Sequence, residues 1–443
     1  MFNADNLVEK WGPVLEHGDL NPIKDHWRKS VTAQILENQQ NFLQEAPANN
    51  APSSLTAGPG TGDVAGYNPI LISLVRRAMP NLIAYDVAGV QPMTGPTGLV
   101  FALRSRYTSQ AGTEALFNEA DTDFAGTGAH VANDGNPLSA ATSGVGASII
   151  RYGSSISTGA SQVVGQGKAT AAGESDISAQ MAFSIERTTV TAKTRALKAE
   201  YTQELAQDLK ALHGLDAETE LANILSAEIL AEINREVVRL ININAKLGAQ
   251  QSDITINGTF NVDADADGRW SVERWKGLLF QLERESNVIA KETRRGKGNI
   301  ALMSSDVASA LSMAGVLDYS PALNTNLNVD DTGNTFAGVL NGRIKVYIDP
   351  YFTADATNGF VTCGYKGSNE IDAGLFYCPY VPLQMVRAVD ENNFQPKIAF
   401  KTRYGLINNP FVSSTATDRS DPTSAAAVNK NQYYRIFKVT NLL

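Results

Sequence analysis

The chain has few of the side chains on which most active sites depend. Its 443 residues include two cysteines and four histidines. Cys363 and Cys378 are too few for a disulfide framework or a four-thiolate zinc site, and the histidines lack the spacing of metal ligands. We therefore expect no catalytic residues, no metal site and no cofactor, and we expect both thiols to be small core side chains.

Long apolar runs and an excess of positive charge are also missing. The longest apolar stretch, residues 69–90, is interrupted by Arg76 and Arg77, so we expect no membrane span. The first twenty residues contain acidic side chains and no apolar run, so we expect no secretory signal. Lys and Arg number 37 against 46 Asp and Glu, a net charge of -9, which argues against a chain that grips nucleic acid.

The apolar material that is present suffices for a sizeable core, since 43% of the residues are hydrophobic. Helical and strand-like periodicities follow one another without a fixed repeat, which predicts an α+β chain. We expect helices near 201–212, 272–291 and 305–313, and strands near 99–104, 181–190, 299–303, 343–348, 359–363, 374–378, 381–387, 397–400 and 433–439.

Several segments differ from this core in composition. Residues 1–45 indicate two or three short helices that form a separable piece, and residues 46–62 are a Pro- and Gly-rich arm. Residues 69–84 have the periodicity of a short amphipathic helix. More than half of residues 121–180 are Gly, Ala, Ser or Thr, so we expect a projecting loop that depends on neighbours for its order.

The strongest single signal is a long helix. Asp216 is a good N-cap, and apolar residues recur at helical spacing from Leu221 to Ile241, before Gly248. These residues predict a helix over 217–247. Such a helix exceeds the needs of a compact domain, so we expect it to act as a strut.

One acidic motif allows an alternative function. Asp263, Asp265, Asp267 and Gly268 match the first half of an EF-hand calcium loop, but position 12 is Arg274 instead of glutamate. A solvated acidic turn is the simpler interpretation. A calcium-dependent binding protein remains the alternative from a different class.

A basic cluster near residue 295 also has two interpretations. Arg294, Arg295 and Lys297 lie in a Gly-containing turn. They form either a solvated turn or a contact with an acidic loop of another subunit.

Four stretches resemble the major capsid protein of T-even-type contractile-tailed bacteriophages, including relatives that infect cyanobacteria. They are GVQPMTGPTGLVFALR at 89–104, ALKAEYTQELAQDLKALHGLDAE at 196–218, DGRW at 267–270 and GSNEIDAGLFYCPYVPL at 367–383. The resemblance extends from about residue 67 to 412. It implies a structural protein and not an enzyme.

The resemblance implies a Hong Kong 97-type capsid fold with an N-terminal arm, an extended loop, a spine helix, and peripheral and axial domains. We expect a propeptide at 1–45, the arm and a helix at 46–98, and the extended loop with a reduced insertion at 99–180. The peripheral domain with the spine helix 217–247 would occupy 181–255, and the axial domain 256–384. Residues 385–443 would return to the peripheral domain and add a C-terminal strand.

The resemblance also implies cleavage of the propeptide after a glutamate that follows Leu or Ile by two residues. Leu43, Glu45 and Ala46 fit best, because the helical pattern there gives way to Pro-rich chain. Ile35 and Glu37 are the second choice.

The implied function is self-assembly into hexameric capsomers of an icosahedral head. The head would enclose double-stranded DNA without sequence-specific binding. The implied partners are other copies of the chain and vertex, portal, scaffold, maturation protease and decoration proteins, with no membrane. The implied location is the virion, after assembly in the host cytoplasm. Within the same fold, the alternative is the shell of a bacterial protein compartment.

Overall fold

The computed structural model describes residues 4–16, 23, 25–45, 82–116, 120, 124–127, 167–174, 177, 179–251, 253–315, 317–318, 335–352, 358–369, 372–390, 394–412 and 422–442. Contacts divide the chain into two units, of which unit 1 is Met1–Val100 with Thr188–Leu443 and unit 2 is Phe101–Arg187. Among the helices of these described residues, none is long and apolar enough to cross a membrane.

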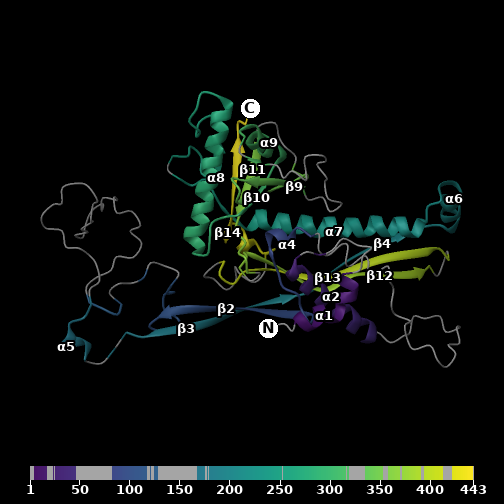
Figure 1. Cartoon of the computed structure of the whole chain (residues 1–443), viewed down its shortest axis with the longest axis horizontal. Helices are drawn as coiled ribbons and strands as arrows, with labels where there is room; N and C mark the ends of the chain where they lie inside the picture. Colours follow the sequence, from purple (N-terminus) through teal and green to yellow (C-terminus); the bar gives the residue numbers. More distant parts are fainter. Residues whose placement is uncertain are drawn as a thin grey trace. The chain divides into compact units, whose positions relative to one another are not determined.

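A four-stranded sheet in unit 1 has the order β1-β12-β13-β4 (Figure 1). Its strands are β1 (Gly89–Val90), β12 (Leu375–Val389), β13 (Pro396–Asn408) and β4 (Lys193–Glu200). The sequence predicted two short strands where β12 is one. Register shifts at Pro379/Val381 and Val381/Gln384 let β12 continue past two prolines, which cannot donate to a ladder.

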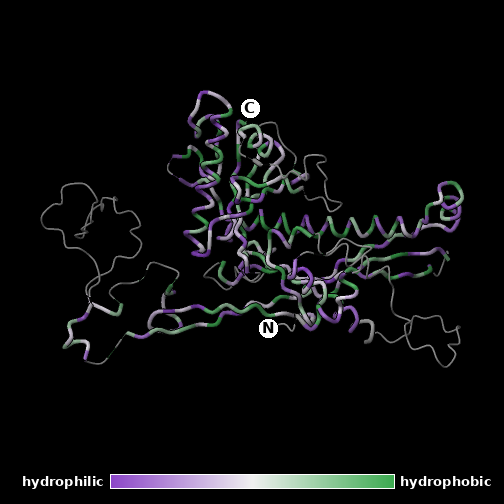
Figure 2. The backbone as a smooth tube through the Cα atoms, in the orientation of Figure 1, coloured by the Kyte–Doolittle hydropathy of each residue, from purple (hydrophilic) through white to green (hydrophobic). Residues whose placement is uncertain are grey.

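The predicted long helix is α7 (Ala217–Asn244), which follows α6 (Gln203–His213). Gly214 ends α6 in the left-handed conformation at φ 67°, and the Asp216 carboxylate accepts from the N–H of Glu218 at 3.4 Å. Figure 2 shows how hydrophobic and hydrophilic residues alternate along α7. The predicted end at residue 247 is wrong, because Ala245–Leu247 forms β5 and pairs with β14 (Asn431–Thr440).

Helices cover both faces of the four-stranded sheet. Gln384, which lies opposite Lys401, donates to Gln39 of α2, whereas Tyr404, three residues further along β13, bonds Glu236 of α7. Successive side chains of a strand point to opposite faces, so α2 and α7 lie on opposite sides. The helices on the α2 side are α1 (Ala4–Leu15) and α2 (His26–Glu45), and α4 (Ala84–Val87) precedes β1.

An eight-stranded sheet forms the other part of unit 1, with the path β5-β14-β11-β7-β10-β9-β8 and with β6 paired to β14. The helices α8 (Ser271–Thr293) and α9 (Ser305–Met313) confirm the predicted helices there. Their apolar residues share a buried cluster with the strands. The strands not yet given are β6 (Thr259–Asn261), β7 (Ile300–Met303), β8 (Leu317–Asp318), β9 (Thr335–Leu340), β10 (Ile344–Ile348) and β11 (Asn358–Gly364).

Unit 2 is built on a two-stranded ribbon of β2 (Thr97–Tyr107) and β3 (Met181–Thr191), both of which begin or end in unit 1. These strands confirm the two predicted near 99–104 and 181–190. A single helical turn, α5 (Thr170–Gly173), lies between them in sequence. The predicted arm at 46–62 lies outside the described residues, as do most of the predicted helix 69–84 and most of residues 121–180.

Candidate functional site

The ribbon exposes a row of large apolar side chains. Phe101 and Phe183 are 61% and 60% exposed, and the row continues through Leu103, Met181 and Ile185. The even-numbered Arg104 and Arg106 contact the even-numbered Ser184 and Glu186 across the strands, so alternation places the odd-numbered apolar residues of both strands together on the opposite face. Among the described residues, no second layer covers the two-stranded ribbon, and these apolar side chains belong to none of the buried apolar clusters.

Ion pairs occupy the other face of the ribbon. Arg104 is buried, with 6% of the residue exposed, and its guanidinium lies 2.9 Å from the Glu114 carboxylate and 3.2 Å from that of Glu186. Arg106 donates to Ser184 at 2.9 Å and pairs with Glu186 at 3.1 Å. The contacts to Ser184 and Glu186 cross-link β2 and β3 without using the apolar row.

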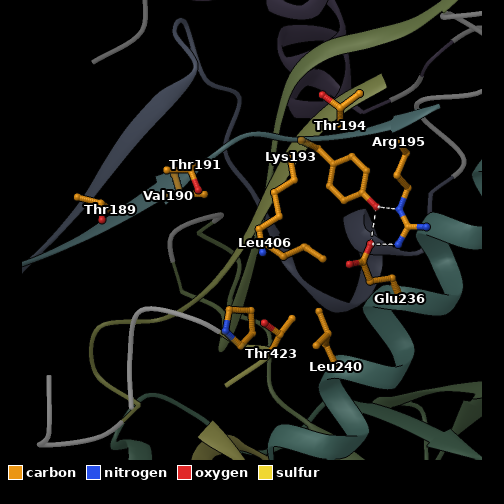
Figure 3. A pocket seen from close by; sticks show the side chains of 12 residues that line it. Thr189, Val190, Thr191, Lys193, Thr194, Arg195, Glu236, Leu240, Leu406 and Thr423 are labelled. Carbon is orange, nitrogen blue, oxygen red and sulfur yellow. Dashed lines mark hydrogen bonds and ion pairs between the residues drawn. The ribbon is translucent and has the colours of Figure 1, made fainter. Parts of the chain in front are cut away.

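A cavity of about 440 Å³ lies between α7 and β4 (Figure 3). Arg195 donates to Glu236 at 2.7 Å and to Glu232 at 2.9 Å, and the Tyr404 hydroxyl bonds both Glu236 and Arg195. Burial and the neighbouring Glu236 raise the pKa of Tyr404 above its usual range. Arg195, Glu236 and Tyr404 therefore satisfy one another's hydrogen-bonding groups. Their arrangement joins α7 to the sheet and does not present a nucleophile beside a base.

The two candidate cleavage sites lie in different parts of α2. Ile35 is fully buried, and the Glu37 carboxylate accepts from Lys10 Nζ at 2.7 Å and from Trp11 Nε1 at 3.1 Å. Leu43 and Glu45 lie in the last turn of α2, and their side chains are outside the described residues, as is the whole of Ala46. The second-choice site, Ile35 and Glu37, therefore lies in the middle of α2, where its side chains are packed against other residues.

The basic turn follows α8. Arg294 ends the helix in the left-handed conformation at φ 54°, and Arg294, Arg295 and Lys297 are all exposed. Arg295 lies 3.9 Å from Asp372 and over the ring of Phe411. One of the three predicted contact residues therefore has partners within its own chain, and the subunit contact stays a prediction.

The acidic motif is a turn whose carboxylates are used locally. Asp265 accepts from the backbone N–H groups of Thr255 and Asn261, and Asp263 pairs with Arg274, the residue at the calcium position 12. Within the residues that the structure describes, no group of three or more potential ligands gathers to hold a metal ion. The arrangement gives the calcium alternative no support.

Both cysteines are buried free thiols in strands, as predicted. Cys363 lies in β11 and Cys378 in β12, in separate apolar clusters. Burial raises the pKa of Cys378 to about 12 and that of Cys363 further, so neither is a thiolate at neutral pH.

Polar side chains of α2 bind the body of the chain, which the sequence did not predict. Arg28 pairs with Asp86 at 2.8 Å, and the Asn38 amide donates to the carbonyls of Met93 at 2.7 Å and Tyr380 at 3.0 Å. Their partners lie far away in sequence, and no local pattern marks such contacts.

Comparison with known proteins gives one family. Residues 64–439 match the family described as major capsid protein Gp23. The chain is 40% identical over 456 residues to the major capsid protein of Serratia phage KSP90, with 99% of this chain and 98% of that protein covered. It is 35% identical over 514 residues to the major capsid protein of Enterobacteria phage T4, with 97% of each covered.

Two weaker similarities are to a capsid vertex protein and to a solved phage capsid structure. The capsid vertex protein of Enterobacteria phage T4 is 28% identical over 246 residues, which cover 52% of this chain and 53% of that protein. Among solved structures, the capsid of Myoviridae phage XM1 aligns at 10% identity with a TM-score of 0.40, over 81% of this chain and 92% of that chain.

Proposed function

We propose, from the premise that this chain belongs to the family of the major capsid protein Gp23, that its copies assemble into hexameric capsomers of an icosahedral phage head. The head encloses double-stranded DNA without sequence-specific contacts. The chain is a structural capsid protein, and its fold is of the Hong Kong 97 type, with α7 as the spine helix and the β2–β3 ribbon as the extended loop.

The apolar row of the ribbon is the observation that best supports self-assembly. Five large apolar side chains in one row need a partner, because exposed patches of this kind mark interaction surfaces. The ion pairs on the opposite face already hold the strands together, so the row is free to bind a neighbouring copy.

The remaining details of the proposal come from the family and from the chain's organisation. Residues 1–45 are a propeptide that a maturation protease removes at Glu45–Ala46, with Glu37 as the weaker choice. Arg294, Arg295 and Lys297 contact a neighbouring subunit. The domain ranges 1–45, 46–98, 99–180, 181–255, 256–384 and 385–443 stay predictions, and β12 crosses the last boundary.

The proposed partners are portal, scaffold, protease, decoration and vertex proteins in the virion, which is assembled in the host cytoplasm. Similarity to a protein named a capsid vertex protein supports a related chain at the vertices. Membership of the cyanophage-like branch stays a prediction. The compartment-shell alternative and the calcium-dependent alternative have no support among the relatives, which are named capsid proteins.

The test is assembly of purified protein followed by electron microscopy. Replacing Phe101 and Phe183 together by threonine retains strand propensity and removes two of the five apolar side chains of the row. We expect capsomers and shells from the parent chain and few from this variant. Met313→Thr, at a 72% exposed position on α9, is the matched control and should assemble normally. Normal assembly of the ribbon variant would refute the role of the row.

A further inference from the structure

The N-terminal helices are packed into the main apolar cluster of unit 1. Trp11 and Leu15 of α1 and Val31, Ile35 and Leu36 of α2 are all buried there. They share the cluster with residues of α7 and the four-stranded sheet. A segment whose side chains belong to the same apolar core as the rest of the chain is held mainly by its apolar contacts. These contacts do not depend on the peptide bond that links the segment to the chain.

Polar contacts fix where α2 sits on the body. They run from Arg28, Asn38 and Gln39 to a surface formed by Asp86, the carbonyls of Met93 and Tyr380, and Gln384, which we call the docking face. The distances are 2.8 Å for Arg28 to Asp86, 2.7 and 3.0 Å for the two Asn38 bonds, and 2.9 Å between Gln39 and Gln384. Arg28 also stacks over the ring of Tyr85.

Asn38 is the most specific of these contacts. Its amide donates both hydrogens to backbone carbonyls of two different segments, while its oxygen accepts from Gln34 within α2 at 3.1 Å. A displaced helix would leave both carbonyls without this donor, and partly buried unpaired carbonyls cost free energy. The face therefore selects one register of α2.

The second helix is tied to the first as well. Lys10 and Trp11 of α1 donate to Glu37, and Lys29 pairs with Glu16 at 3.2 Å. Residues 4–45 thus have internal contacts in addition to those with the body, which lowers the entropy cost of binding as a unit.

We propose that the body of the chain is a receptor for a two-helix peptide, and that residues 4–45 stay bound to the docking face after the chain is cut between Glu45 and Ala46. Among the described residues, the contacts that hold the segment join residues 4–45 to one another and to residues from 82 onward, and none of these contacts depends on the peptide bond at the cut. Cleavage and release of the segment are therefore separate events.

The inference has a biological role only if the proposed cleavage at Glu45–Ala46 occurs, but the following test does not require that cleavage. The recognition sequence of an unrelated site-specific protease replaces residues 47–53 of the full chain. After complete cutting, size-exclusion chromatography and native mass spectrometry measure how much of the N-terminal segment remains with the body. We expect the two parts to travel together at micromolar concentration.

Matched variants identify the contacts responsible. Asn38→Leu keeps helix propensity but removes both donors, and we expect the affinity of the cut segment to fall roughly tenfold. Asn41→Leu makes the same change at an exposed position of α2 and should leave retention unchanged. Asp86→Ala tests the docking face from the other side, and circular dichroism confirms that each variant is folded.

Immediate separation of the parent segment from the body would overturn the inference. Equal retention by the Asn38 and Asn41 variants would overturn the assignment to the docking face. Neither result bears on assembly into capsomers or on the natural cleavage site, because the cut is engineered. Conversely, particles that contain only uncut chain would refute the proposed processing and leave the receptor property intact.

Discussion

A buried ion pair shows how single residues decide the stability of the eight-stranded sheet. Glu285 of α8 is fully buried, and its Oε1 accepts from the N–H of Ala249 and from the amides of Gln251 and Gln281. Arg435 of β14 lies 3.1 Å from its Oε2, at ion-pair distance but poorly aligned for a hydrogen bond. The carboxylate is thus held from two sides in a region that water does not reach.

Arg435→Met should leave the Glu285 charge buried without its cation. Removing one partner of a buried pair costs about 3–5 kcal/mol, so we expect the free energy of unfolding to fall by that amount in urea titrations. Arg343→Met is the matched control, because Arg343 pairs with Glu283 near the surface, with 40% of the arginine side chain exposed. The control should change stability by no more than about 1 kcal/mol, and an equal loss in both would contradict the argument.

The Glu37 carboxylate should make the stability of the N-terminal helices depend on pH. Burial raises its pKa, but the hydrogen bonds from Lys10 and Trp11 outweigh burial and hold the pKa below its ordinary value. A lowered folded pKa gives stability that is present at neutral pH and lost as pH falls through that pKa. We expect the exchange protection of α1 amides to fall below about pH 4.5 and Glu37→Gln to lack this step. An identical pH profile in the variant would refute the assignment to Glu37.

At the scale of elements, α7 is stabilised by one buried face. Ile233 is 2% exposed and lies in the main cluster, whereas Ile224 on the same helix is 61% exposed. Ile233→Ala should lower the free energy of unfolding by about 2–5 kcal/mol, because it leaves a cavity in the core. Ile224→Ala should change it by less than about 0.5 kcal/mol. Chemical denaturation of both variants gives the comparison, and similar losses would contradict the packing of α7.

Elements with local signals could be predicted from the sequence, and those made by distant pairing could not. Gly214 and Asp216 mark the boundary between α6 and α7 because their roles depend on neighbouring backbone groups. The end of α7 was missed because residues 245–247 leave the helix to pair with β14, nearly two hundred residues away. The sequence predicted two strands where β12 is one, because bulges against β13 let the strand continue past Pro379 and Pro382.

At the scale of the whole molecule, the sequence predicted helices in residues 1–45 and a structural role for the chain. It did not predict which surface of the chain residues 1–45 bind. Buried polar residues such as Gln34 and Gln39 lie beside the buried Ile35 and Leu36 in α2, so no clear apolar stripe marks the side that binds. Its polar contacts to Met93 and Tyr380 use backbone carbonyls, which have no signature in a sequence. The alternation of apolar residues in β2 and β3 could be predicted from the sequence, whereas their exposure depends on the two-stranded sheet having no second layer within the described part of the chain.

The packing of α2 also predicts the order of proteolysis. A protease binds its substrate in an extended form, so cutting after Glu37 requires the middle of α2 to leave the core with Ile35, whereas Glu45 requires only that the last turn fray. With a Glu-specific protease and intact-mass detection, we expect the cut at Glu45 to be at least about tenfold faster than the cut at Glu37. Asn38→Leu should speed the cut at Glu37 and leave that at Glu45 unchanged, because it weakens docking and not the helix end. Protein extracted from particles should then begin at Ala46, and equal cutting rates at the two glutamates in the parent chain would show that docking does not protect α2.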